Sequence, residues 1–151
     1  MKNVIVYATD IHGDVKVFEN LLAHAIRLDA RAAVIGGDIM PNLFFGDVVL
    51  QKEFLEMVLF PMFRKFRERT GKEIFIMMGN DDSIGNVELF RKAEKEGWLK
   101  FMLNNVHEFG EFQVAGYSYI NPFSFIFREW QRTEPQIEKD LARLMASSKP
   151  G

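Results

Sequence analysis

Apolar runs alternate with amphipathic stretches over the first hundred residues of the chain. The run from Val4 to Ala8 is continuous and β-rich, which is typical of a strand buried on both faces. Two similar runs follow, at 32–35 and 73–78. Apolar side chains at helical spacing predict helices over 15–28 and 46–70, and Pro61 should kink or divide the second. This strand–helix–strand order predicts an α/β fold with parallel strands.

A different pattern begins near residue 100, after a short predicted helix over 87–96. Short strands are expected at 101–106 and 108–119, with Gly110 turning a hairpin. The sequence from Thr133 to Gln136 is typical of a capping box and predicts a helix that ends near Ala146. The aromatic residues between these elements could line a substrate mouth, but packing in a core or interface is favoured: Phe123, Phe125, Phe127 and Trp130.

Length, charge and composition narrow the class of protein. The 151 residues correspond to one domain, 1–151, with a core of its own. The formal net charge of -2 gives no electrostatic reason to expect nonspecific binding to nucleic acid or membranes. The absence of cysteine excludes disulfides, thiolate metal sites and cysteine nucleophiles. No apolar run approaches the length of a membrane span, so a cytoplasmic protein is expected.

Polar residues that can bind metal ions follow each of the three predicted strands. Asp10 and His12 follow the first, Asp38 the second and Asn80 the third. Because the carboxyl ends of parallel strands meet at one edge of a sheet, these side chains should lie together. Asp10 and His12 can chelate one divalent cation, which Asp38 could bridge to a second cation bound by Asn80. Two cations roughly 3.5–4 Å apart would suit the in-line hydrolysis of a phosphate ester.

These residues resemble the motifs of the calcineurin-like metallophosphoesterase family, whose pattern is D-x-H, G-D, G-N-H-D/E, and later H and G-H-x-H. Asp10-Ile11-His12, Gly37-Asp38 and Gly79-Asn80-Asp81-Asp82 match the first three motifs in order. The resemblance covers about the first 85 residues. It implies an αββα sandwich and a binuclear centre of two divalent ions (Mn, Fe, Zn, Ni or Mg). It also implies hydrolysis of a phosphomonoester or phosphodiester by a metal-bound hydroxide.

The chain departs from the family pattern in two places. Asp81 stands where the family has a histidine that by resemblance assists the leaving group, so Asp81 is the candidate catalytic acid, although a passive acid in the loop is favoured. The later histidine motifs are absent, so we expect this chain to be the N-terminal part of a longer phosphoesterase. Such a part would leave apolar surface uncovered, which a second copy of the chain could cover.

Simpler interpretations of the same residues stay open. Asp82 suits the N-cap of the following helix, in addition to any support of the site. His107 is tempting as a missing ligand, but a structural role is favoured. The fold could serve as a catalytically inactive scaffold for protein partners. A response-regulator-like domain is disfavoured because no lysine closes a later parallel strand.

Overall fold

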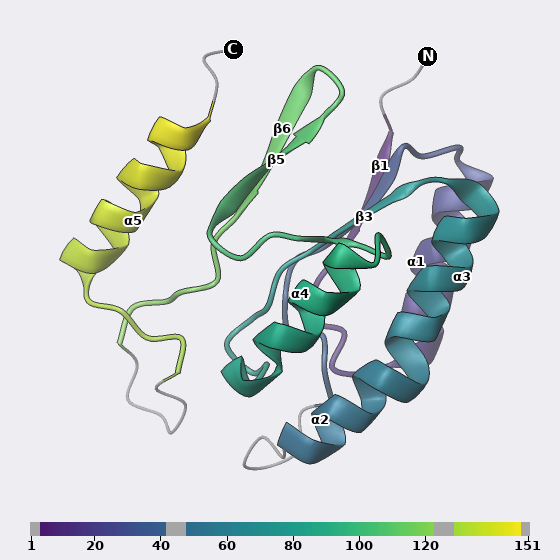
Figure 1. The fold of residues 1–151 in the computed structure, drawn as a ribbon, viewed down its shortest axis with the longest axis horizontal. Coiled ribbons are helices and arrows are strands. Elements are labelled where there is room, and N and C mark those ends of the chain that lie inside the picture. Colours follow the sequence, from purple (N-terminus) through teal and green to yellow (C-terminus); the bar gives the residue numbers. More distant parts are fainter. Residues whose placement is uncertain (1–3, 42–47, 123–128, 149–151) are drawn as a thin grey trace.

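A four-stranded parallel sheet forms the centre of the protein, which is described by a computed structural model over residues 4–41, 48–122 and 129–148 (Figure 1). The strands lie in the order β1-β2-β3-β4. Their bounds are Ile5–Ala8, Ala32–Ile35, Glu73–Ile76 and Lys100–Phe101. Every neighbouring pair is parallel, as the alternation of apolar runs and amphipathic helices predicts.

The first helix, α1 (Val15–Arg27), begins directly after the first polar stretch. The Asp14 carboxylate caps it by accepting hydrogen bonds from the backbone N–H of Lys16 at 2.9 Å and of Val17 at 3.3 Å. Its buried face carries Phe18, Leu21, Leu22 and Ala25. This apolar stripe packs α1 against β1 and β2, so the cap also fixes where the loop after β1 must end.

The long helix between β2 and β3 is interrupted, as Pro61 predicts. It comprises α2 (Val48–Phe54), the π-helix η1 (Leu55–Leu59) and α3 (Phe60–Thr70), and Pro61 lies in the first turn of α3. The predicted start at Gly46 lies outside the described residues. Val49 is 62% exposed, although the apolar pattern placed it on the buried face; the neighbouring Gln51 is buried at 1% exposure instead.

Two hydrophobic clusters cover the two faces of the sheet. Helices α1, α3 and α4 (Val87–Lys95) lie on one face, where the larger cluster joins alternate strand residues such as Ile74 and Ile76 to Phe18, Phe63 and Phe90. On the other face, Phe75 packs with Phe109 and Val114. Phe109 and Val114 belong to a hairpin formed by β5 (Asn105–Phe109) and β6 (Phe112–Gly116).

Strand β1 is not buried on both faces, contrary to the prediction. Ile5 and Tyr7 are 52% and 61% exposed, whereas Val6 points into the larger cluster. The reason is positional: β1 is an edge strand of the sheet, and the residues packed in the smaller cluster belong to β2, β3 and their neighbours rather than to β1.

The C-terminal part differs in detail from the predicted strands. The expected strand at 101–106 is divided between β4 and β5, because Met102–Asn104 turn the chain from the sheet into the hairpin. Gly110, with a φ of 64°, lies in the hairpin turn as predicted.

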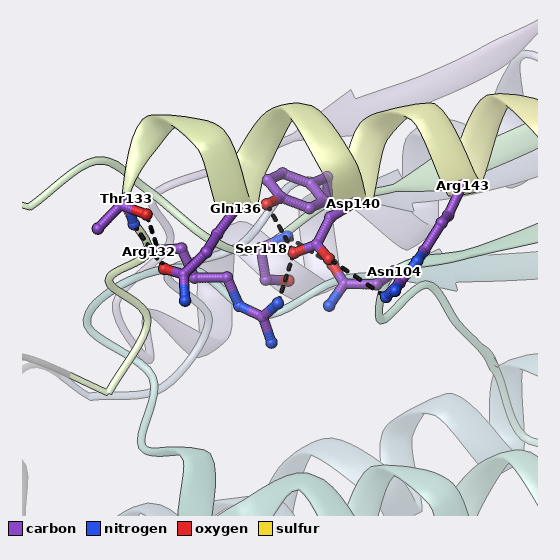
Figure 2. Close-up of polar contacts among 8 residues, drawn as sticks. Asn104, Ser118, Arg132, Thr133, Gln136, Asp140 and Arg143 are labelled. Atoms are coloured by element: carbon purple, nitrogen blue, oxygen red, sulfur yellow. Dashed lines mark hydrogen bonds and ion pairs between the residues drawn. The ribbon is translucent and has the colours of Figure 1, made fainter.

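Helix α5 (Glu134–Ser147) lies beside the hairpin (Figure 1). The predicted capping box is present, since the Gln136 carboxamide oxygen accepts from the Thr133 backbone N–H at 2.9 Å. Figure 2 shows Asp140 reaching from this helix toward Arg132, with which it forms an ion pair at 2.6 Å. Polar contacts of Asp140 thus hold the helix, and none of its residues is fully buried.

No helix within the described ranges combines the length and the apolar character that crossing a membrane requires.

Candidate metal site

Three of the predicted metal ligands converge at the carboxyl ends of β1 and β2. One ligand atom each from Asp10, His12 and Asp38 lies within 4.8 Å of the other two. Asp10 and His12 are exposed and Asp38 is half-buried. Two carboxylates and an imidazole form a donor set that suits divalent cations, and the exposed side leaves room for water or substrate. The structure thus brings three of the four predicted ligands together, and the fourth, Asn80, lies in the loop after β3.

The same three residues have an unusual backbone conformation. Asp10, His12 and Asp38 have positive φ values of 55°, 48° and 48°. Within the described ranges only two other non-glycine residues, Asp29 and Asn104, share this left-handed conformation. Such conformations cost free energy and concentrate at functional sites, where the surrounding structure must hold them in place. Backbone strain thus coincides with the candidate ligands.

Backbone hydrogen bonds between the two loops hold this conformation. The N–H groups of Asp10, His12 and Gly13 donate to the carbonyl oxygens of residues 37, 38 and 39 at 3.1, 2.8 and 2.8 Å. These bonds continue the pairing of β1 with β2 past the ends of both strands. They fix the positions of Asp10 and His12 relative to Asp38 before any ligand binds.

Two glycines allow the loops after β2 and β3 to approach closely. A Cβ on Gly37, which has a φ of 106°, would lie 2.8 Å from the Cα of Gly79. A Cβ on Gly79 would lie 2.2 Å from Oδ1 of Asp38. Any side chain at either position would therefore push the loops apart. These glycines bring the loop that carries Asn80 and Asp81 against the carboxylate of Asp38.

The Asp38 carboxylate sits in a partly desolvated position. Its Oδ1 accepts the backbone N–H of Asp81 at 2.9 Å. Burial raises the pKa of Asp38, an effect that the Asp81 N–H opposes and the nearby acidic charges of Asp81 and Asp10 reinforce. A cation beside Asp38 would favour its ionised form, so the position suits a carboxylate that binds metal.

Asp82 is a buried carboxylate that ties two loops together. It is 1% exposed, and it accepts backbone N–H groups from Ile39 at 2.9 Å, Met40 at 2.8 Å and Gly79 at 2.8 Å. Burial outweighs these donors and raises its pKa to about 6. The prediction that Asp82 caps the next helix is wrong: Ser83 is the N-cap of η2 (Ile84–Asn86), because the Asp82 side chain turns inward.

The remaining predicted residues lie in the loop after β3. The Asn80 carboxamide nitrogen donates to the Asp81 carboxylate at 2.8 Å, which orients the two side chains toward each other. Asp81 also meets Asp38 through its backbone N–H. His107 lies on β5, where Nε2 is 2.9 Å from the Phe101 carbonyl oxygen and 3.6 Å from Glu94, so its contacts are structural.

Three residues brace this loop through contacts that the sequence did not predict. Gln51 of α2 bonds to the backbone on both sides of Asp82, as described below. The Trp130 indole N–H donates to the Asp82 carbonyl oxygen at 2.6 Å, and Glu129 accepts the Ile84 backbone N–H at 2.9 Å. Trp130 is 1% exposed, which agrees with core packing; Phe123, Phe125 and Phe127 lie outside the described residues. The available signal in the sequence was that Gln51 is a polar residue at a position where the helix is buried.

Comparison with known proteins bears on the fold. No protein-family model and no curated protein sequence matches the chain. Two solved chains match its structure. One, from a crystal structure, aligns over 99% of this chain with a TM-score of 0.66 and 14% sequence identity. This chain spans 66% of that protein. At such low identity the likeness supports a shared α/β fold and carries no function.

Proposed function

We propose that this protein binds a divalent cation through Asp10, His12 and Asp38 and hydrolyses a phosphate ester there. The observation that carries the proposal is the gathering of these three ligand atoms within 4.8 Å of one another at the strand ends. The order of the three sequence motifs supports the same function by resemblance to the calcineurin-like metallophosphoesterases. We extend the proposal to the fold, with the sheet and hairpin corresponding to part of that family's αββα sandwich.

The residues around the ligands suggest how each would contribute. A bound divalent cation, such as Mn, Fe, Zn, Ni or Mg, would lower the pKa of a water molecule and offset charge on the phosphoryl oxygens. Asp38 and Asn80 are the proposed ligands of a second cation. Asp81, which contacts Asn80, is the proposed donor of a proton to the leaving-group oxygen. Esters with good leaving groups should depend least on Asp81, since their departing oxygen needs no proton.

Calorimetry with Mn²⁺ and hydrolysis of an activated phosphodiester, bis(p-nitrophenyl) phosphate, test this proposal. Asp38→Ala should lower both Mn²⁺ affinity and the hydrolysis rate more than tenfold, because it removes a ligand. The matched control is Asp14→Asn, which removes a nearby charge but keeps a side-chain oxygen that can cap α1. The control should stay within twofold of the wild type.

The calorimetric stoichiometry separates the hydrolase from a scaffold. Two bound ions with turnover support the hydrolase. One tightly bound ion without turnover supports a metal-binding scaffold for protein partners. A loss of less than tenfold on Asp38→Ala contradicts the assignment of Asp38 as a ligand.

A further inference from the structure

The Gln51 side chain is a buried amide whose hydrogen-bonding groups are used by the loops around the candidate site. Gln51 lies on α2 and is 1% exposed. Its carboxamide oxygen accepts the Ser83 backbone N–H at 2.9 Å and the Asn86 side-chain amide at 3.4 Å. Its nitrogen donates to the carbonyl oxygens of Asp81 at 3.1 Å and Pro41 at 3.5 Å.

These contacts require an amide rather than an apolar side chain of similar size. The buried Ser83 N–H needs an acceptor, and the part-buried Asp81 carbonyl oxygen on the same loop takes a donor. Methionine at position 51 would leave the Ser83 N–H and the Asp81 carbonyl without these partners. Glutamate would keep the acceptor but bring a carboxylate against two carbonyl oxygens. Glutamine satisfies both loop groups at once.

The contacts of Gln51 also join two loops that carry candidate ligands. Pro41 follows Asp38 in the loop after β2, and Asp81 follows Asn80 in the loop after β3. The same two loops meet on the ligand side, where the Asp81 N–H donates to Asp38. Two side chains therefore hold this segment: Gln51 bonds to the Asp81 carbonyl oxygen and the Ser83 N–H, and Asp38 accepts the Asp81 N–H.

We propose that Gln51 is a positioning residue that sets the spacing between Asp38 and the Asn80–Asp81 segment and so tunes metal affinity. This inference rests on the proposed function for its effect on metal binding. Its structural part, the hydrogen bond that Gln51 donates to the Asp81 carbonyl oxygen, does not depend on that function. The two parts are measured separately.

Two variants of nearly unchanged volume, Gln51→Met and Gln51→Glu, test the proposal. Both should bind Mn²⁺ at least tenfold more weakly than the wild type by calorimetry. In metal-free protein, both should also raise the hydrogen-exchange rate of the Asp81 amide at least tenfold by NMR. The second variant keeps the acceptor, so it tests the role of the donor even where Gln51→Met folds poorly.

A matched control separates positioning from a general loss of stability. Ile74→Val removes one buried methyl group from β3, away from the loops that follow β1, β2 and β3, and should lower the urea midpoint of unfolding. It should leave Mn²⁺ affinity and Asp81 exchange within twofold of the wild type. Folded Gln51 variants with Asp81 exchange and Mn²⁺ affinity within twofold of the wild type overturn the proposal. If the wild type binds no Mn²⁺, the proposed function fails, and unchanged Asp81 exchange still overturns the positioning role.

Discussion

The buried carboxylate of Asp82 makes the stability of the metal-free protein depend on pH in a way that can be calculated. Burial raises the pKa of Asp82 in the folded protein from 3.8 to about 6. A folded pKa above the unfolded one means that the folded state binds the proton more tightly. The contribution of Asp82 to stability is therefore greatest below pH 4 and is lost as the pH rises through 6. At about 1.4 kcal/mol per tenfold change in the ionisation constant, the decline is about 3 kcal/mol.

Asp82→Asn isolates this effect. The variant cannot ionise, and its carboxamide has one acceptor oxygen where the carboxyl group has two, so it cannot accept all the backbone N–H groups of Ile39, Met40 and Gly79. It should therefore be less stable than the wild type at pH 4, by about 1–3 kcal/mol for each donor left unsatisfied. The difference should shrink as the pH rises to 6.5, because only the wild type pays to ionise a buried group.

Urea unfolding followed by circular dichroism, in chelator and at several pH values between 3.5 and 7, measures this difference. The chelator matters because a bound cation would itself favour ionised carboxylates. Asp29→Asn is a control on an exposed acid outside the site. A gap between wild type and Asp82→Asn that widens as the pH rises would refute the reasoning. It would mean that the three N–H donors outweigh burial and lower the pKa of Asp82.

Two further predictions concern the residues that hold the site loops. Gly79→Ala should weaken Mn²⁺ binding at least tenfold by calorimetry, because its Cβ would overlap the Asp38 carboxylate. Gly71→Ala is the control for a loss of stability away from the site, because a Cβ there meets nothing within 4 Å while the φ of 66° strains alanine. Equal effects on Mn²⁺ binding would contradict the prediction. Trp130→Phe should destabilise the protein by about 1–3 kcal/mol in urea unfolding, because it leaves the Asp82 carbonyl oxygen without its indole donor; an unchanged midpoint would contradict a structural role for that bond.

The parallel sheet and the candidate ligands could be predicted because both depend on local patterns. Each strand is a short apolar run, and each ligand follows such a run directly in the sequence. Parallel pairing then brings Asp10, His12 and Asp38 to one edge without further information. The exposure of Ile5 and Tyr7 could not be predicted in this way, since a residue run does not reveal which strand lies at an edge.

The residues that support the site could not be predicted, because their partners lie far away in the sequence. Gln51 contacts a loop thirty residues later, and Trp130 contacts one 48 residues earlier. Both bond to backbone groups, which carry no side-chain signature in the sequence. The inward turn of Asp82 was hidden for the same reason, since an aspartate beside Ser83 equally suits a helix cap.

The loops at the strand ends combine a strained backbone with many hydrogen bonds to neighbouring segments, and this combination affects how a cation would bind. Left-handed conformations at Asp10, His12 and Asp38 are costly for an isolated chain, so the rest of the fold must offset that cost. The hydrogen bonds between the loops and the buried contacts of Asp82 and Gln51 are interactions that can do so. A ligand group held in this way needs little rearrangement to bind a cation, and a preformed site loses less entropy on binding than a flexible one. Changes at the supporting residues should therefore affect the candidate ligands through the spacing of the loops, even though the supporting residues are not among those ligands.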